Sequence, residues 1–254
     1  MGERTRPWPA GTPNWVDLSV DDPVAATASY AELFGWTCVR RGTDEYWLSS
    51  VDGRDVGGIG AKRTRDAPSR WTTYLATDQV ERTLDAVIAH GGRVVSEPRE
   101  VQELGRLATA ADPGGAVFGL WQAGEHIGTD RRTDPGSLVW SEALSRDFEA
   151  AKAFYTTVFG YEAEEIGGDG PRYAALYAGG RPVAGVAELH PDLPAGKLSP
   201  QWLPIFATDA TDAAVGRVCA GGGDVVCDPF ATDFGRMAIL RDAESAPFAV
   251  IRLG

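Results

Sequence analysis

WVDLSVDDPVAATASYAELFGW, residues 15–36, decides the fold because the chain contains this stretch twice. The second copy, WSEALSRDFEAAKAFYTTVFGY, spans residues 140–161 and aligns with the first without a gap. The identical positions include Asp22 with Asp147 and Tyr30 with Tyr155. A repeat at about half of the chain length predicts two similar domains.

Each copy predicts a strand followed by a helix. Residues 15–20 alternate, so that Val16, Leu18 and Val20 point to one face of the strand, and Trp15 and Asp17 point to the other. The apolar face can pack against the helix that follows. We therefore expect the face that carries Trp15 and Asp17 to hold the functional site.

The predicted helix has clear ends. Asp22 is the expected N-cap, Pro23 suits the first helical position, and Gly35 ends the helix after about three turns. Three short strands follow up to residue 60, and the same order of strand, helix and three strands recurs over residues 71–122. The second half repeats the whole pattern.

Four strand-helix-strand-strand-strand modules are therefore predicted, which is an α+β fold. One helix covers only one face of a four-stranded sheet, so we expect the modules to pair into two domains with half-open barrel clefts. The predicted bounds are a disordered N-terminus at 1–12, a first domain at 13–122, a linker at 123–136 and a second domain at 137–254.

Composition excludes several classes of protein. A net charge of -12 argues against a nucleic-acid-binding surface. No run approaches the ~18 apolar residues of a membrane span, and the three cysteines form no CxxC motif, which favours a reducing compartment. We expect a cytoplasmic protein with neither nucleic-acid nor membrane partners. A monomer is expected because two domains are already fused, with a homodimer as the alternative.

The chain resembles a tandem two-domain member of the vicinal oxygen chelate superfamily, which contains glyoxalases, bleomycin-resistance proteins and extradiol dioxygenases. The motifs that carry the resemblance are ASYAELFGW (28–36), KAFYTTVFGY (152–161), a Gly-Gly helix stop before RVV and DVV, and DPGGAVFGLWQ (112–122). The start GTPNW (11–15) is similar to that of actinobacterial-type members.

The resemblance also implies where a metal would be held in each domain. In the first domain the positions of the usual His or Gln, His and Glu ligands carry Trp15, Thr72 and Gly119. In the second domain the same positions carry Trp140, Leu203 and Ala249. None of these side chains is a good ligand for a divalent ion, so neither a metal nor another cofactor is expected.

Strand phase instead predicts clefts lined by aromatic and apolar side chains. Gly119 beside Trp121 is expected to leave open space for a flat ligand stacked between indoles. The parity of the middle strands stays open, so either Tyr46 or Trp47 could line the first cleft. The expected ligand-binding residues are Trp15, Tyr46, Trp47, Thr72, Tyr74, Gly119, Trp121, Trp140, Tyr173, Leu203 and Ile205.

Asp17 and Glu142 are the candidate catalytic residues, because each places a carboxyl group on the cleft face of a repeated strand. A buried carboxyl group must be paired or have a raised pKa, and a raised pKa would suit a general base. The alternative is a structural salt bridge to an arginine that recurs in the repeat, such as Arg106 or Arg236.

These features favour a metal-independent protein that binds a small hydrophobic or aromatic molecule, in the manner of natural-product self-resistance by sequestration. The alternative is a cofactor-free enzyme of secondary metabolism, an isomerase or cyclase that moves a proton with Asp17 or Glu142. A third reading is a scaffold with vestigial clefts. The sequence leaves open whether one or both clefts are used.

Overall fold

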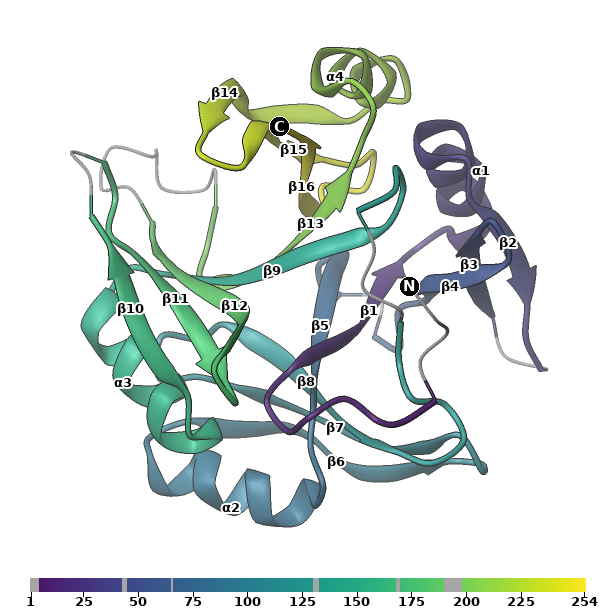
Figure 1. Cartoon of the computed structure of the whole chain (residues 1–254). Helices are drawn as coiled ribbons and strands as arrows, with labels where there is room; N and C mark the ends of the chain where they lie inside the picture. The colour runs from purple at the N-terminus through teal and green to yellow at the C-terminus, as the bar shows by residue number, and fades with distance from the viewer. Residues whose placement is uncertain (1–4, 43–44, 65, 130–132, 168–169, 190–197) are drawn as a thin grey trace. The chain divides into compact units, whose positions relative to one another are not determined.

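The computed structural model of the chain describes residues 5–42, 45–64, 66–129, 133–167, 170–189 and 198–254 (Figure 1). The first half contains, in order, β1 (Pro13–Val20), α1 (Pro23–Phe34), β2 (Thr37–Arg40), β3 (Tyr46–Val51), β4 (Arg54–Ala61), β5 (Arg70–Ala76), α2 (Val80–Ala89), β6 (Arg93–Val101), β7 (Gly105–Ala111) and β8 (Val117–Ala123). This is the predicted order of two modules.

The second half repeats that order. It contains β9 (Leu138–Ser145), α3 (Phe148–Phe159), β10 (Glu162–Ile166), β11 (Tyr173–Ala178), β12 (Arg181–Glu188), β13 (Gln201–Ala207), α4 (Thr211–Ala220), β14 (Asp224–Thr232), β15 (Gly235–Arg241) and β16 (Pro247–Leu253). The prediction of an α+β fold built from four such modules is confirmed.

Each half forms one eight-stranded sheet. The strand order is β2-β3-β4-β1-β5-β8-β7-β6 in the first sheet and β10-β11-β12-β9-β13-β16-β15-β14 in the second. Parallel pairs such as β1 with β4 and β5 with β8 lie in the middle of the strand order. Antiparallel pairs such as β2 with β3 and β6 with β7 lie at its two edges. The outermost strands of each list are not neighbours, so neither sheet closes into a barrel.

The helix ends follow the predicted local chemistry. The Asp22 carboxylate accepts a hydrogen bond from the backbone N–H of Ala25 at 2.9 Å, and Pro23 opens α1. Gly35 ends the helix with φ of 71°, a conformation that glycine adopts without steric cost. Asp147 and Gly160 have the same roles in α3.

Two compact units divide the chain in a different way from its two halves. The first comprises residues 1–15, 73–128 and 141–202, and the second comprises 16–72, 129–140 and 203–254. Each unit thus contains one helical module from each half. The domain bounds 13–122 and 137–254 stay a prediction.

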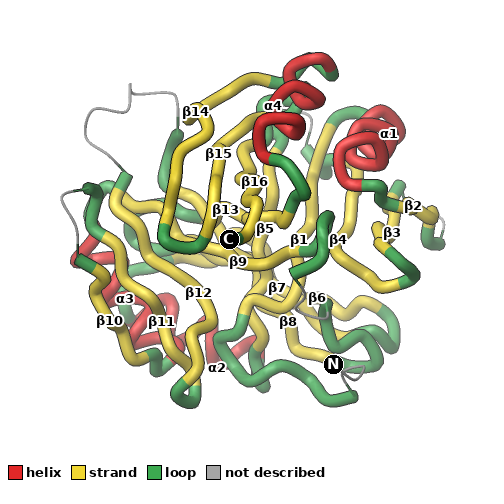
Figure 2. The backbone as a smooth tube through the Cα atoms, turned by 45° about the horizontal axis from the view of Figure 1, so that its top comes forward, coloured by secondary structure: helices red, strands yellow, loops and turns green. Residues whose placement is uncertain are grey.

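The core of the second unit lies between the helix-covered faces of its two modules. Val16, Leu18 and Val20 of β1 are fully buried there with Tyr30 of α1, which confirms the predicted phase of this strand. Helices α1 and α4 lie side by side in this unit (Figures 1 and 2), and Phe248 of β16 joins the same core. Burial of these large apolar groups provides most of the stability of the unit.

The core of the first unit has the same construction. Helices α2 and α3 are in contact (Figure 1), and Leu84 of α2 and Phe154 of α3 lie in one buried cluster with Phe118 of β8.

No helix in the described ranges is both long and apolar enough to cross a bilayer.

Hydrogen bonds fix the end of the N-terminal segment, residues 11 and 12, to the rest of the first unit, although the predicted domain begins only at residue 13. The backbone N–H of Gly11 donates to the carbonyl of Ala76, and the N–H of Ala76 donates to the carbonyl of Thr12. The hydroxyl of Tyr161 donates to the carbonyl of Gly11. These bonds hold Gly11 and Thr12 in place, although both lie in the segment expected to be disordered.

Candidate functional site

The second unit contains a carboxylate, a tyrosine and a glycine on three adjacent strands. Asp17 of β1 lies opposite Gly58 of β4. Tyr46 of β3 donates a hydrogen bond from its hydroxyl to Oδ1 of Asp17 at 2.7 Å. A Cβ atom at position 58 would overlap the hydroxyl of Tyr46 and the carboxylate of Asp17. The absence of a side chain at Gly58 therefore makes room for this pair.

The first unit contains the corresponding group from the second half of the chain. Glu142 of β9 lies opposite Gly185 of β12, and a Cβ atom at position 185 would overlap the hydroxyl of Tyr173 of β11. Gly185 is the third residue of the stretch VAGVA, as Gly58 is of VGGIG, so the sequence itself shows that the two glycines correspond. The room that this glycine leaves for a tyrosine hydroxyl depends on which strands pair, which the sequence pattern does not encode.

Glu142 differs from Asp17 in its surroundings. Its side chain is 8% exposed, and burial raises the pKa of its carboxyl group from 4.5 to about 7. No hydrogen bond or ion pair to this group is found within the described residues, and burial is the single cause of the shift. A carboxyl group of this kind changes protonation near neutral pH, as a general acid or base must.

The structural salt bridge expected as an alternative is wrong for both arginines. Arg106 pairs with Glu81 at 2.5 Å and with Glu100 at 3.2 Å. Arg236 holds Asp212 with two hydrogen bonds of 2.8 and 2.9 Å. Both arginines thus bind acidic groups other than the two candidate catalytic residues.

Strand pairing settles the parity of β3. Tyr46 lies opposite Gly60 and therefore shares the face of Gly58 and Asp17. Trp47 lies opposite Ile59, which belongs to the core under α1, so Trp47 points to the other face. The guanidinium of Arg40 lies 5.6 Å from the centre of its ring. Trp47 therefore does not share a face with Asp17, and its role in ligand binding stays a prediction.

The aromatic side chains expected to line an open first cleft pack closely against neighbouring groups of the first unit. Tyr74 lies opposite Gly119 on the neighbouring strand, and its ring occupies the volume that a side chain at 119 would take. The expectation that Gly119 opens space for a ligand is therefore wrong. Trp121 donates a hydrogen bond from Nε1 to the carbonyl of His126 at 2.8 Å.

His126 lies in the segment predicted to be a linker, residues 123–136, and is half-buried. Its imidazole lies edge-on to Trp15, with 4.4 Å between ring centres, and 5.7 Å from the ring centre of Trp121. Trp15 is 5% exposed. Nothing in the sequence pairs residue 126 with residue 15, so this contact could not be predicted.

The remaining predicted residues lie in the second unit. Thr72, Leu203 and Ile205 are buried, Ile205 lies opposite Ala249, and Trp140 is half-buried. Their assignment to ligand binding stays a prediction.

The metal implied by the fold family does not fit these side chains. Trp140, Leu203 and Ala249 offer no donor atom at the three expected positions of the second half, and Trp15 and Gly119 offer none in the first. Within the part of the chain that the structure describes, no three His, Cys, Asp or Glu side chains gather in a group that could hold an ion.

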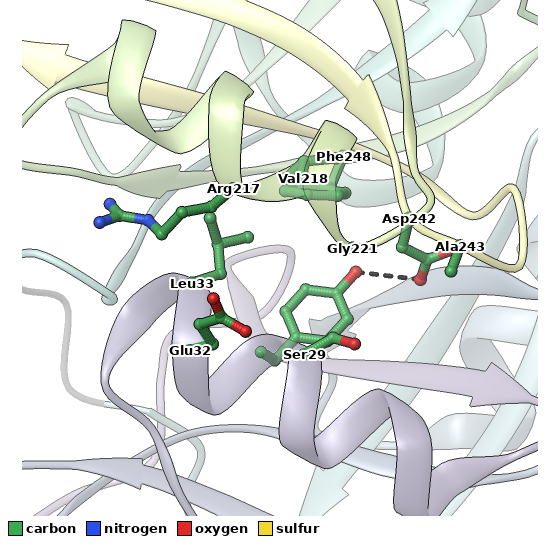
Figure 3. A pocket seen from close by; sticks show the side chains of 10 residues that line it. Ser29, Glu32, Leu33, Arg217, Val218, Gly221, Asp242, Ala243 and Phe248 are labelled. Carbon is green, nitrogen blue, oxygen red and sulfur yellow. Dashed lines mark hydrogen bonds between the residues drawn. The ribbon is translucent and has the colours of Figure 1, made fainter.

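A cavity lies in the second unit, between α1 and α4 (Figure 3). Its volume is about 50 Å³, and Glu32 and Leu33 from α1 face Arg217 and Val218 from α4 across it. Small-molecule sites usually measure 300 Å³ or more, so this cavity is too small for an organic ligand. None of the predicted site residues lines it.

Comparison with known proteins shows which family the chain resembles. Residues 15–121 match the glyoxalase-like domain, and residues 137–247 match the Glyoxalase/Bleomycin resistance protein/Dioxygenase superfamily. "Putative glyoxylase CFP32" of Mycobacterium tuberculosis is 36% identical over 252 residues, 95% of each chain. Anthracycline biosynthesis protein DnrV of Streptomyces peucetius is 34% identical over 96% of this chain and 94% of its own length.

Solved structures share the fold at much lower identity. The 2,2',3-trihydroxybiphenyl 1,2-dioxygenase of Sphingomonas wittichii strain RW1 has a TM-score of 0.65 at 14% identity, with 96% of this chain and 90% of that chain covered. The Mn(II)-bound glyoxalase of Novosphingobium aromaticivorans has a TM-score of 0.61 at 17% identity, with 95% and 83% covered. Two matches in tandem and full-length relatives above 30% identity show that the chain belongs to the glyoxalase/bleomycin resistance protein/dioxygenase superfamily.

Proposed function

We propose that this protein binds a small, flat, hydrophobic or aromatic molecule of secondary metabolism without the help of a metal ion. The observation that carries the proposal is the replacement of the family's metal-ligand positions by Trp15, Thr72 and Gly119 in one half and by Trp140, Leu203 and Ala249 in the other. Buried indole and aliphatic groups favour aromatic ligands through apolar contact and ring stacking.

The relatives support the class of ligand. DnrV, which is similar over nearly the whole chain, is named for anthracycline biosynthesis. Anthracyclines contain a flat hydroxyanthraquinone, whose rings suit stacking and whose hydroxyl and carbonyl oxygens suit a carboxyl group and tyrosine hydroxyls. We therefore propose a polycyclic aromatic with oxygen substituents. Retention of such a molecule would serve biosynthesis or self-resistance.

Proton transfer without a cofactor is the second candidate function. It is favoured by Glu142, whose buried carboxyl group has a pKa of about 7 and no cation beside it among the described residues. Such a group can accept a proton from an acidic C–H or O–H of a bound ligand and return it to another position. The products would then differ from the ligand by the position of a hydrogen atom.

Tryptophan fluorescence tests the binding function. The protein, treated with EDTA and then desalted, is titrated with a panel of hydroxyanthraquinones, naphthoquinones and matched hydrocarbons that lack oxygen. We expect saturable quenching by at least one oxygenated polycycle, with the hydrocarbon of the same ring number binding less tightly. A complete lack of quenching across the panel would contradict the proposal.

Deuterium exchange tests the second candidate. Each ligand that binds is incubated in D2O with wild-type protein and with Glu142→Gln, and its C–H signals are followed by NMR. Enzymatic proton transfer predicts deuterium uptake that the Gln variant lacks. Uptake at the same rate with both proteins, or no uptake above the protein-free rate, leaves binding without turnover as the function.

A further inference from the structure

The two repeated carboxylate sites are not equivalent. In the second unit, the carboxylate of Asp17 already accepts the hydroxyl hydrogen of Tyr46 at 2.7 Å. A hydrogen bond from a neighbouring phenol offsets part of the free-energy cost of burying a carboxylate. A ligand would have to compete with Tyr46 for this group.

The aromatic residues of the first half are also engaged with one another. Within the first unit, the ring of Tyr74 fills the space over Gly119, and the imidazole of His126 lies edge-on against Trp15. The carbonyl of His126 is fixed by Nε1 of Trp121. Trp15 and Trp121 are thus buried and already packed against a neighbouring imidazole of the chain.

The repeat in the second half is different. Glu142 is one methylene group longer than Asp17 and is more than nine-tenths buried, and within the described residues it makes no hydrogen bond or ion pair. A buried carboxyl group with no partner is unfavourable, and a bound hydrogen-bonding group would relieve that cost. The hydroxyl of Tyr173 on β11 lies over Gly185 of β12, and Gly185 is opposite Glu142 on β9, so the hydroxyl extends over the strand next to the one that carries Glu142.

We propose that the second-half group of Glu142, Tyr173 and Gly185 is the working ligand site, and that it holds a hydroxyl or carbonyl oxygen of an aromatic ligand. In the first-half group of Asp17, Tyr46 and Gly58, the carboxylate is hydrogen-bonded to the tyrosine, and the group has a structural role. This inference rests on the proposed binding function for the class of ligand, and it selects one of two sites that the sequence alone treats as equal.

Matched substitutions in the two halves test the assignment. The probe is 1,8-dihydroxyanthraquinone, with anthracene as the ring-matched hydrocarbon, and affinity is measured by tryptophan quenching. Glu142→Gln and Tyr173→Phe are each expected to weaken binding of the quinone about tenfold or more, which corresponds to one lost hydrogen bond to a buried group. Their affinity for anthracene is expected to change less than twofold.

The matched variants Asp17→Asn and Tyr46→Phe are expected to weaken quinone binding less than twofold. Glu162→Gln, on the exposed strand β10, controls for the loss of one negative charge. Thermal unfolding of every variant separates loss of binding from loss of folding. Weaker binding by the Asp17 and Tyr46 variants, with Glu142→Gln unchanged, would overturn the site assignment and leave the binding function standing.

Chemical labelling without a ligand distinguishes failure of the site assignment from failure of the proposed binding function. Dicyclohexylcarbodiimide adds to protonated carboxyl groups in apolar surroundings and forms a stable N-acylurea that retains all atoms of both reactants. At pH 6 we expect the adduct, located by peptide mass spectrometry, on Glu142 and not on Asp17. If the adduct forms on Asp17 in preference to Glu142, the assignment fails. If Glu142 is labelled but no probe binds the wild-type protein, the aromatic-ligand function fails while the accessible carboxyl group stands.

Discussion

Tyr30 in the first half of the chain donates a hydrogen bond to Asp242 in the second half, at 3.1 Å across 212 positions of sequence. Trp71 donates from Nε1 to the same tyrosine oxygen at 3.1 Å. The pKa of Tyr30 is raised well above its usual value, mainly by burial, so the hydroxyl remains a donor over the whole physiological range. The bond joins the two modules of the second compact unit.

Tyr30→Phe is expected to lower the free energy of unfolding by about 1–3 kcal/mol, because Trp71 loses its acceptor and Asp242 loses one donor in a buried place. Urea denaturation measures the change. Tyr177→Phe is the control, since the Tyr177 hydroxyl bonds Glu164 on the exposed surface and should contribute much less. Equal stability of the Tyr30 and Tyr177 variants would contradict the importance of this bond.

The first unit repeats the arrangement with Tyr155, whose hydroxyl donates to Asp112 at 3.1 Å and accepts from Nε1 of Trp202 at 2.8 Å. Tyr155→Phe should therefore destabilise the protein to a similar extent. A double variant with Tyr30→Phe should show additive losses, because the two bonds have no residue in common.

Glu142 predicts a pH dependence of stability. Below pH 4.5 the carboxyl group is protonated in both the folded and the unfolded chain, and between pH 4.5 and about 7 only the unfolded chain releases the proton. Stability from this group is therefore complete at low pH and is lost as pH rises through the folded pKa. The loss is complete by about pH 8 and amounts to roughly 3 kcal/mol for a shift of this size.

Glu142→Gln removes this effect because the amide does not titrate. The variant should unfold like the wild type near pH 4.5 and become the more stable of the two above pH 7, as measured by urea denaturation at a series of pH values. A constant difference between the two proteins from pH 4.5 to 8 would show that the Glu142 carboxyl group is solvated or paired.

Gly58 predicts a steric effect of a single methyl group. In Gly58→Ala the new Cβ would overlap the hydroxyl of Tyr46, so the ring must move and the bond to Asp17 must break. We expect a loss of about 1–3 kcal/mol, seen as a Tm lower by several degrees. Gly216→Ala in α4 is the matched control, since no atom lies within 4 Å of its Cβ and alanine favours a helix. A Tm that falls equally in both variants would contradict the account.

Much of the fold could be predicted because its signals are local. The caps at Asp22 and Gly35 and the alternation of Val16, Leu18 and Val20 depend on neighbours in sequence, and the structure places all of them as predicted. The repeat then extends the prediction to α3 and β9. Local periodicity is a reliable guide when one face of an element is buried.

The interior of the candidate site could be predicted only in part. The burial of Glu142 follows from strand phase, but the filling of Gly119 by Tyr74 depends on which strand lies next to β8. The contact of His126 with Trp15 joins residues that no pattern connects. Such contacts between distant residues are set by tertiary packing, which periodicity does not encode.

The middle strands were ambiguous for a geometric reason. The register of β3 with β4 shifts between Ser49 and Ser50, and that of β11 with β12 shifts between Leu176 and Tyr177. A bulge adds one residue to one strand and reverses the inside and outside positions beyond it. The face of Tyr46 could therefore be assigned only from the observed pairing with Gly60.

Calorimetric titration of EDTA-treated, desalted protein with 1,8-dihydroxyanthraquinone tests the central claim most directly. We expect saturable binding of one molecule per chain, with an affinity that Mn(II), Fe(II) or Zn(II) does not change and that Glu142→Gln lowers about tenfold. Binding that occurs only after one of these metals is added, or that is the same with and without the Glu142 carboxyl group, would contradict it.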